Sequence, residues 1–348
     1  MTIASSNKVA LVMGVLAVLL GIHVLKTSTP RIAFRGGEYP ANPSPYELSL
    51  EEVAAYRRDG FLLKRGLTSA DQLDASIQAG DRLFSVTTFR DWLIGGVSSY
   101  AKLRVQTWRS TSEFAQLAFE STFPSISAQL LSEKESIRIL KDGFFAQVST
   151  DAGCGFHVDD SFFWPASEDS TGVNFWLALS STVAAEGGGI RIVNQSLLSP
   201  ETFEECKGVI RSGDAGYNRT CNMEERSPSC HQRMLDASVL YDMNPGDAIL
   251  WDRWTFHRGE PFKNAASVKE AVHKMRYTIR YIPSTAVAQG VLHPSVKQGD
   301  RFDSPFYPQV WPSHRKKEID TIQAGLEDDY TYDILTMAKL LVYKIGLA

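Results

Sequence analysis

The chain has 348 residues, of which 43% are hydrophobic and 22% are charged, and its formal net charge is −4. This composition is that of an ordinary globular protein, long enough for one large domain or two small ones. The sequence shows no basic face, so a nucleic-acid partner has no electrostatic support. The spacing of the four cysteines fits no zinc-finger template. Three of them share one polar stretch and form either one disulfide or a set of free thiols: Cys206, Cys221 and Cys230.

The chain begins with an apolar run at residues 9–25, VALVMGVLAVLLGIHVL, interrupted only by His23. Its length of roughly 17 residues is near the lower limit for spanning a bilayer. No small-residue cleavage site follows, so we predict an uncleaved anchor within residues 1–26 and a single-pass, endomembrane location; a cleaved signal peptide is the alternative. The side of the membrane stays open. Basic residues after the run favour a cytosolic domain, whereas sequons at Asn194 and Asn218 suit a lumenal one.

The next segments predict a linker followed by helices. Residues 27–48 are rich in Pro, Gly and Ser and are typical of a linker. A helix is expected from residue 50 to Gly60, with Ser49 as N-cap and Glu52 completing a capping box. A short strand over 61–67 and an amphipathic helix over 69–84 follow. Residues 85–135 are mixed and mostly helical around 114–131.

The second half of the chain predicts a β-rich core. Strand patterns separated by turn residues appear at 137–149, 172–181, 189–194, 247–251 and 276–283. They favour a mostly β fold with flanking helices, whose core is a double-stranded β-helix of the jelly-roll or cupin-like type, within a domain at 49–290. Residues 199–237 lose this periodicity, and we interpret them as an inserted loop that acts as a lid. Residues 291–348 form a carboxyl-terminal extension whose apolar part, 330–347, is expected to dock on the domain.

The segment GFHVDD carries the candidate metal ligands. His157 and Asp159 are two residues apart, so on an extended strand both side chains point to the same face. A third ligand must come from elsewhere, and His257 in DRWTFHRGEPF is the best candidate. Two histidines and one carboxylate form the facial arrangement of non-haem iron(II) oxygenases, which leaves coordination positions open. A structural zinc site would instead be closed by four protein ligands.

The later strand MRYTIRYIP offers two arginines on one face, Arg276 and Arg280. A 2-oxo acid that chelates iron has a far carboxylate, which arginine pairs best through a bidentate fork. Either arginine can instead be a surface residue of the strand.

Together these segments resemble the phytanoyl-CoA dioxygenase family of iron(II)/2-oxoglutarate oxygenases. The resemblance covers about residues 51–283 and rests on the order and spacing of five segments. They are EEVAAYRRDGFLLKRGLTSADQL, GFHVDD, VNFWLALSSTVAAEGGGIRIVNQS, NPGDAILWDRWTFHRG and MRYTIRYIP. Two departures stand out. The gap between His257 and Arg276 is longer than the family's, and Asn194-Gln195-Ser196 replaces a Pro-Gly-Ser-His-like turn.

The resemblance implies that His157, Asp159 and His257 bind Fe(II), with 2-oxoglutarate and O2 as cosubstrates and ascorbate as a candidate reductant. Arg276 would pair the far carboxylate of 2-oxoglutarate, with Arg280 as the fallback, and Trp176 would lie beside the cosubstrate or serve only as a core residue. The expected reaction is hydroxylation of an unactivated C–H bond of a small, lipid-like substrate, releasing succinate and CO2. Desaturation, cyclisation or epimerisation on the same scaffold, or a non-catalytic jelly-roll binding module, are the alternatives. The presence of Asp159 argues against the halogenating relatives.

Overall fold

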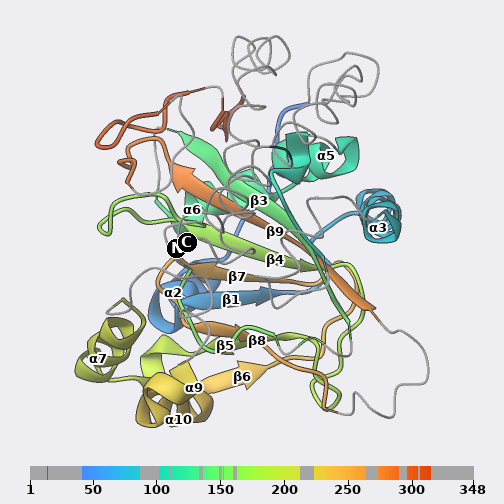
Figure 1. The fold of residues 1–348 in the computed structure, drawn as a ribbon. Coiled ribbons are helices and arrows are strands. Elements are labelled where there is room, and N and C mark those ends of the chain that lie inside the picture. The colour runs from blue at the N-terminus through green and yellow to red at the C-terminus, as the bar shows by residue number, and fades with distance from the viewer. Residues whose placement is uncertain are drawn as a thin grey trace.

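Two antiparallel sheets form the centre of the computed structural model (Figure 1). The structure describes Gly14 and residues 41–86, 102–109, 111–132, 136–148, 151, 153–159, 163–211, 223–263, 273–289, 296–304 and 306–314. The predicted anchor, apart from Gly14, and the predicted tail helix at 330–347 lie outside this part. No helix in the described part is long and apolar enough to cross a membrane.

The larger sheet has the strand order β1-β7-β4-β9-β3-β10, with β2 paired to β3. Its strands are β1 (Phe61–Lys64), β2 (Lys102–Val105), β3 (Ile137–Val148), β4 (Val173–Ala178), β7 (Ala248–Asp252), β9 (His273–Pro283) and β10 (Gln309–Trp311). The smaller sheet has the order β6-β5-β8, from β5 (Ile190–Val193), β6 (Ser238–Leu240) and β8 (His257–Gly259). The mostly β expectation is confirmed, and the curled antiparallel sheets are those of a jelly-roll-like core.

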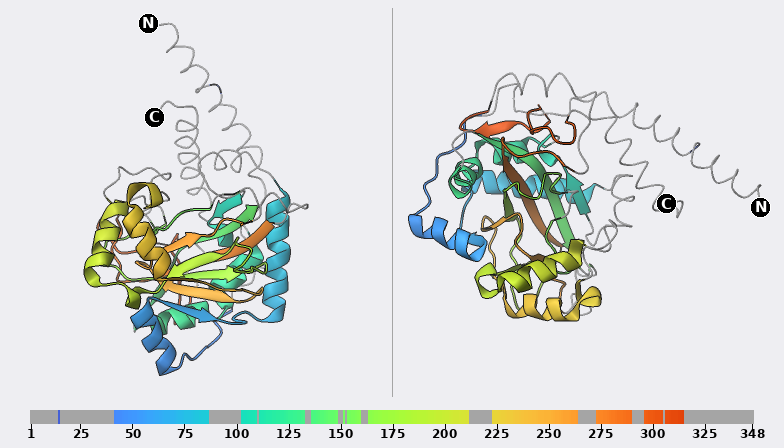
Figure 2. Two further views of the ribbon diagram at one scale, coloured as in Figure 1. Left: turned by 90° about the horizontal axis from the view of Figure 1, so that it is seen from below. Right: turned by 90° about the vertical axis from the view of Figure 1, so that its left-hand side faces the viewer.

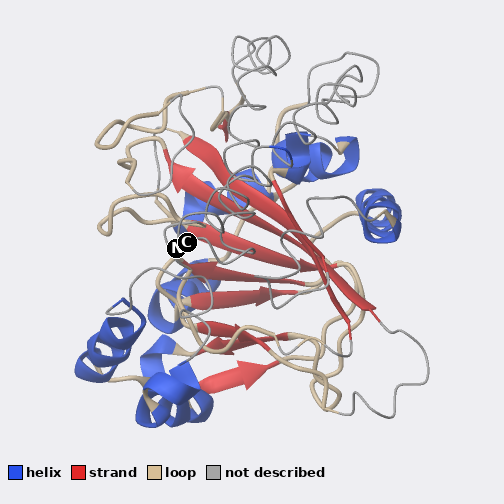
Figure 3. Ribbon diagram, in the orientation of Figure 1, coloured by secondary structure: helices blue, strands red, loops and turns tan. Residues whose placement is uncertain are grey.

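The two faces of the larger sheet have different chemistry because side chains alternate along each strand. On β9, Met275, Tyr277 and Ile279 belong to the hydrophobic cluster on the outer face. The same cluster includes residues of α5 (Ser112–Glu120) and α6 (Phe123–Leu130), and α3 (Ala70–Ser85) packs against it. Strands therefore occupy the middle of the molecule and helices its periphery (Figure 3). The alternate residues of β9, which include both arginines, face inward.

The amino-terminal helix of the domain forms as its sequence predicts. α2 (Leu50–Asp59) begins after Ser49, whose side chain accepts a hydrogen bond from the Glu52 N–H while the Glu52 carboxylate accepts one from the Ser49 N–H. This reciprocal capping box satisfies two amides that the helix itself leaves free. The helix ends at Gly60, whose φ of 80° lies in the left-handed region that glycine adopts most readily. The chain then enters β1, which pairs with β7.

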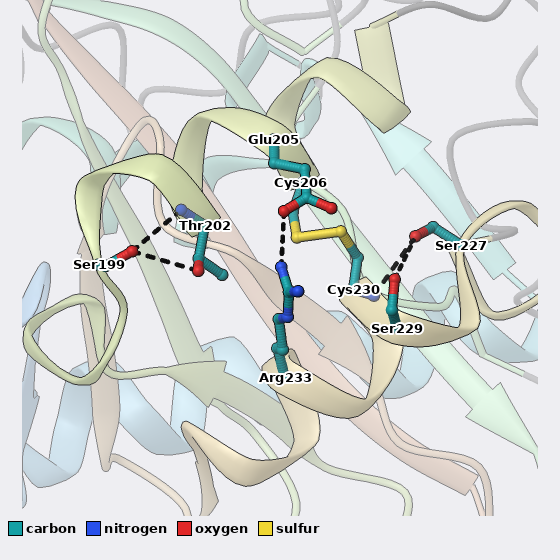
Figure 4. The surroundings of a disulfide bond; sticks show 8 residues. All are labelled: Ser199, Thr202, Glu205, Cys206, Ser227, Ser229, Cys230 and Arg233. Atoms are coloured by element: carbon teal, nitrogen blue, oxygen red, sulfur yellow. Dashed lines mark hydrogen bonds and ion pairs between the residues drawn. A yellow bond between two sulfur atoms is a disulfide. The ribbon is translucent and has the colours of Figure 1, made fainter.

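The segment 199–237 is not the structureless loop that we predicted. It contains α7 (Pro200–Arg211), α9 (Met223–Arg226) and α10 (Pro228–Asp236). A disulfide joins Cys206 to Cys230, and an ion pair of 2.6 Å joins Glu205 to Arg233, so α7 and α10 are tied together (Figure 4). The disulfide alternative left open by the sequence is thus the one observed for these two cysteines.

These helices form a layer behind the smaller sheet, on the opposite side of the strands from α3 (Figure 2). Their cluster of buried residues includes Phe156, Val158 and Phe256, which alternate along the chain with the candidate ligands. The described helices therefore support the ligand-bearing segments from outside and give the lid interpretation no support. Short helices of this kind are stabilised mainly by tertiary packing, which the hydrophobic periodicity of the sequence does not reveal.

The remaining short elements are η2 (Thr107–Arg109) and η3 (Gln195–Leu197).

Candidate metal centre

The two histidines are brought together by the main chain. His257 is the first residue of β8, and His157 joins it in an isolated antiparallel bridge. Each N–H donates to the other residue's carbonyl oxygen, at 3.0 Å from His157 and 2.9 Å from His257. Residues paired in this way project their side chains to the same face of a sheet. The ring centroids are consequently only 4.3 Å apart.

Asp159 completes the group. It lies two residues after His157 in extended chain, and its Oδ1 is 3.7 Å from Nε2 of His257. One ligand atom from each of His157, Asp159 and His257 lies within 4.8 Å of the others. Within the described ranges no further His, Cys, Asp or Glu joins this group. The predicted triad therefore converges as a group of three candidate ligands.

Hydrogen bonds set the orientation of both rings. Nδ1 of His257 lies 3.0 Å from the carbonyl oxygen of Thr255, and Nδ1 of His157 lies 2.7 Å from that of Gly155. A carbonyl only accepts, so each Nδ1 donates and Nε2 is the nitrogen left to bind a metal. Burial, with the nearby His157, lowers the pKa of His257 to about 3. This imidazole is therefore neutral at pH 7, as a metal ligand must be.

The second oxygen of Asp159 is held by two other side chains. Oδ2 accepts hydrogen bonds from Nε and Nη2 of Arg280, at 3.0 and 2.8 Å, and from Nε1 of Trp164, at 3.2 Å. Burial acts to raise the pKa of Asp159, but the charge of Arg280, with His257 and His157, outweighs it and lowers the pKa to about 2. The carboxylate is ionised throughout the physiological pH range.

Arg276 lies four residues before Arg280 on the inward face of β9. Its Nη1 donates to Oε1 of Gln147 at 3.2 Å, and its guanidinium carbon is 5.8 Å from the ring centres of both Phe145 and Trp176. Trp176 is itself buried on β4, in a cluster with Ile190, Ile249 and Trp251. Both sequence readings of Trp176, as a core residue and as a neighbour of the cosubstrate, agree with this position.

The sequence did not indicate how Trp164 reaches Asp159. Arg253, directly after β7, donates hydrogen bonds to the carbonyl oxygens of Ala166, Ser167 and Ser170 and thereby folds the segment that follows Trp164. Its guanidinium carbon lies 5.7 Å from the Trp164 ring centre. Gly172 leaves room for the ring, because a Cβ at this position would overlap it. No local sequence pattern points to this contact, because Arg253 lies far from Trp164 in the chain, in the segment of His257.

The other histidines that the structure describes lie elsewhere. His231 is 4.0 Å from Glu224 on the helical layer, His273 stacks on Phe84, and His314 meets the edge of Phe119. These contacts make them structural or surface residues. His293 and Asp160 lie outside the described residues.

Solved structures with a similar fold include three that are each 17% identical in sequence. One is SnoK, a non-heme alpha ketoglutarate dependent carbocyclase from nogalamycin biosynthesis, with a TM-score of 0.58 over 78% of this chain and 100% of that one. Another is the epimerase SnoN in complex with Fe3+, alpha ketoglutarate and nogalamycin RO, at 0.56 over 75% and 97%. EctD from S. alaskensis with bound Fe follows at 0.51 over 77% and 87%. No curated protein sequence matches the chain.

Two histidines and one carboxylate are the ligand set that defines a class of protein, the non-haem iron enzymes. Within this class the family can be stated. The family model described as phytanoyl-CoA dioxygenase matches residues 56–269, more than half of the sequence, so the chain belongs to the phytanoyl-CoA dioxygenase family. The resemblance noted in the sequence is confirmed.

Proposed function

We propose that this protein is an Fe(II)- and 2-oxoglutarate-dependent dioxygenase that hydroxylates an unactivated C–H bond of a small organic substrate. The observation that carries the proposal is the convergence of His157, Asp159 and His257 in one group, within a chain of the phytanoyl-CoA dioxygenase family. Similar folds that hold Fe and alpha ketoglutarate support it.

The donor set fits Fe(II). Two neutral imidazoles and one carboxylate suit a ferrous ion, and three ligands leave positions for a chelating 2-oxo acid and O2. In this assignment Nε2 of His157, Nε2 of His257 and Oδ1 of Asp159 hold the metal. When bound, the metal and cosubstrate supply the oxidising chemistry: 2-oxoglutarate loses CO2 and becomes succinate, one oxygen atom of O2 enters succinate, and the other enters the substrate. Ascorbate would serve as the reductant that keeps the iron ferrous.

The inward face of β9 suits a dianionic cosubstrate. Arg276 and Arg280 are both 3% exposed, so their charges act in a medium of low dielectric. We assign the far carboxylate of 2-oxoglutarate to Arg276, because Arg280 is already paired with Asp159. Trp176, beside Arg276, would pack against the cosubstrate and exclude water. Nη1 of Arg280 is buried without a hydrogen-bond partner in the described structure, so a ligand oxygen has a donor available there as well.

The direct test is the formation of succinate from 2-oxoglutarate in the presence of Fe(II), O2 and ascorbate. The wild-type protein should form succinate even without its native substrate, at a slow uncoupled rate. His157→Ala should abolish this turnover, and His231→Ala, a histidine outside the site, should retain it. Full turnover by His157→Ala would overturn the site assignment. Fe(II) binding without any turnover would favour the alternative of a non-catalytic binding module.

The substrate is proposed to be small and lipid-like, because the apolar run at residues 9–25 would place the enzyme beside a membrane.

The outcome of oxidation depends on how the substrate lies relative to the metal. Similar folds include a carbocyclase and an epimerase, so ring closure and epimerisation are the rival outcomes, together with desaturation. Mass spectrometry of the product separates them. A gain of one oxygen atom supports hydroxylation, a loss of two hydrogens indicates desaturation or cyclisation, and an unchanged mass indicates epimerisation.

We further propose that residues 1–26 anchor the protein in a membrane, with 27–48 as linker, 49–290 as the oxygenase domain and 291–348 as an extension. The Cys206–Cys230 disulfide favours the oxidising, lumenal side, because such bonds rarely persist in a reducing cytosol. Membrane fractionation with protease protection tests both points. The full chain should sediment with membranes and be protected, whereas a chain lacking residues 1–26 should not sediment. Digestion of the intact domain from the cytosolic side would overturn the proposed orientation.

A further inference from the structure

The carboxylate of Asp159 is divided between two tasks. Oδ1 faces the histidines, at 3.7 Å from Nε2 of His257. Oδ2 accepts three hydrogen bonds, two from Arg280 and one from Trp164. Such charge-assisted bonds to a buried carboxylate are among the strongest in proteins. Oδ2 therefore already has hydrogen-bond partners in the metal-free protein.

We propose that Arg280 and Trp164 are positioning residues that hold Oδ2 so that Asp159 presents only Oδ1 to the metal. The inference rests on the proposed function and deepens it. A carboxylate can bind a metal through one oxygen or through both. If both oxygens of Asp159 bound, one coordination position needed by the cosubstrate or O2 would be filled. Holding Oδ2 keeps the face of three ligands open.

Packing and hydrogen bonds within the protein hold both donor side chains, Arg280 and Trp164, in place. The Arg280 guanidinium lies over the ring of Phe163, with its carbon 4.4 Å from the ring centre, and its strand is central in the larger sheet. Trp164 is fully buried. The segment after it is fixed by the three hydrogen bonds from Arg253, and Gly172 provides the space for its ring. Both donors are thus preorganised, which is what a residue that orients a metal ligand requires.

The two arginines of β9 consequently have different tasks. They are four positions apart in the sequence, which corresponds to about 13 Å along β9. Arg280 has two of its nitrogens on Asp159, whereas Arg276 donates to Gln147 and lies between Phe145 and Trp176. Loss of Arg280 should therefore affect the metal, and loss of Arg276 should affect the 2-oxoglutarate carboxylate.

The test measures the dissociation constant of Fe(II), under anaerobic conditions and without cosubstrate, by titration calorimetry. Arg280→Gln should weaken Fe(II) binding by about 10- to 100-fold, the usual effect of removing a partner of a metal ligand. Arg280→Lys retains the charge with poorer geometry and should fall between Arg280→Gln and the wild type. Trp164→Phe removes the N–H and retains a smaller aromatic ring, so it should weaken binding by a few-fold. Arg276→Gln is the matched control and should leave the Fe(II) constant within about twofold of the wild type while raising the KM for 2-oxoglutarate.

An unchanged Fe(II) constant in Arg280→Gln, with a raised KM for 2-oxoglutarate, would overturn the proposal and make Arg280 the cosubstrate anchor. Circular dichroism and the unfolding midpoint check that each variant folds. If Arg280→Gln does not fold, the Fe(II) dissociation constants of Arg280→Lys and Trp164→Phe are the test instead. Wild-type constants in both variants would overturn the positioning role. Failure of the proposed function is distinguishable. Fe(II) binding that responds to Arg280 without any succinate formation would leave the positioning role intact, whereas a wild-type chain that binds no Fe(II) would refute both.

Discussion

The ion pair between Asp159 and Arg280, at 2.8 Å, is buried on both sides, with side-chain exposures of only 3% and 4%. It joins the segment after the first metal ligand to the central strand β9 of the larger sheet. A charge interaction thus links the segment that carries two of the candidate ligands to the larger sheet. This arrangement makes the same residue pair important for stability in the metal-free protein and for geometry in the metal-bound one.

We predict strong coupling between Asp159 and Arg280 in the metal-free protein. Asp159→Asn leaves a buried arginine without its counter-charge, which should cost about 3 kcal/mol or more in the free energy of unfolding. The double variant with Arg280→Met should be less destabilised than the sum of the single variants by about 2 kcal/mol. Urea unfolding in the presence of a chelator measures both quantities. Combining Asp159→Asn with Arg276→Met serves as the control and should be additive within about 0.5 kcal/mol; equal coupling for the two arginines would contradict the prediction.

We predict that Gly172→Ala disturbs Trp164. The added methyl group would overlap the indole ring, which cannot move freely because it is fully buried. Overpacking of this kind costs about 1–3 kcal/mol, and the change should appear in the tryptophan fluorescence as well as in the unfolding midpoint. Gly208→Ala is the matched control, since Gly208 is exposed on α7 with no atom near its Cβ position. That variant should be more stable than the wild type by about 0.5–1 kcal/mol, and destabilisation of both variants to the same extent would refute the explanation.

We predict that the Cys206–Cys230 disulfide stabilises the helical layer behind the smaller sheet. The bond closes a segment with a sequence separation of 24, for which loop-closure entropy gives about 3 kcal/mol. Replacing both cysteines by serine should lower the free energy of unfolding by roughly that amount. Because Phe156 and Phe256 pack in the same cluster, amide hydrogen exchange should also increase around His157 and His257. Unchanged exchange at these ligands would show that the layer does not support the metal centre.

We predict an unusual pH dependence from Asp142, a buried carboxyl on β3. Burial raises its pKa to about 6, although hydrogen bonds from Thr107 and the Trp108 amide oppose the shift. The folded state therefore binds a proton more tightly than the unfolded state, whose pKa is about 3.9. This contribution stabilises the protein below about pH 4 and is lost as the pH rises to 6 and above, by up to about 3 kcal/mol. Asp142→Asn should remove this loss, as measured by unfolding at pH 4.5 and pH 7. An equal loss in the variant and the wild type would assign the effect to another group.

Much of the candidate centre was predictable from local pattern. The alternation of His157 and Asp159 requires only that the segment be extended, and the His257 segment follows a recognisable buried strand. The capping box at Ser49 and Glu52 involves neighbours in sequence, so it too was predictable. The helices within 199–237 were not predictable from local pattern. Their stability depends on the disulfide and on packing against Phe156 and Phe256, which are far away in the chain.

The sequence by itself predicted the three candidate ligands. It also placed His157 with Asp159, and Arg276 with Arg280, on common faces, because strand alternation fixes which side chains share a face. It did not determine which of the two arginines pairs with Asp159. Only the tertiary structure decided that Arg280 pairs with Asp159 while Arg276 donates to Gln147, because those contacts depend on how the two sheets face each other and on strand register. The same holds for Trp164, whose contact with Asp159 is supported by Arg253, a residue far away in the chain, and by the space that Gly172 leaves.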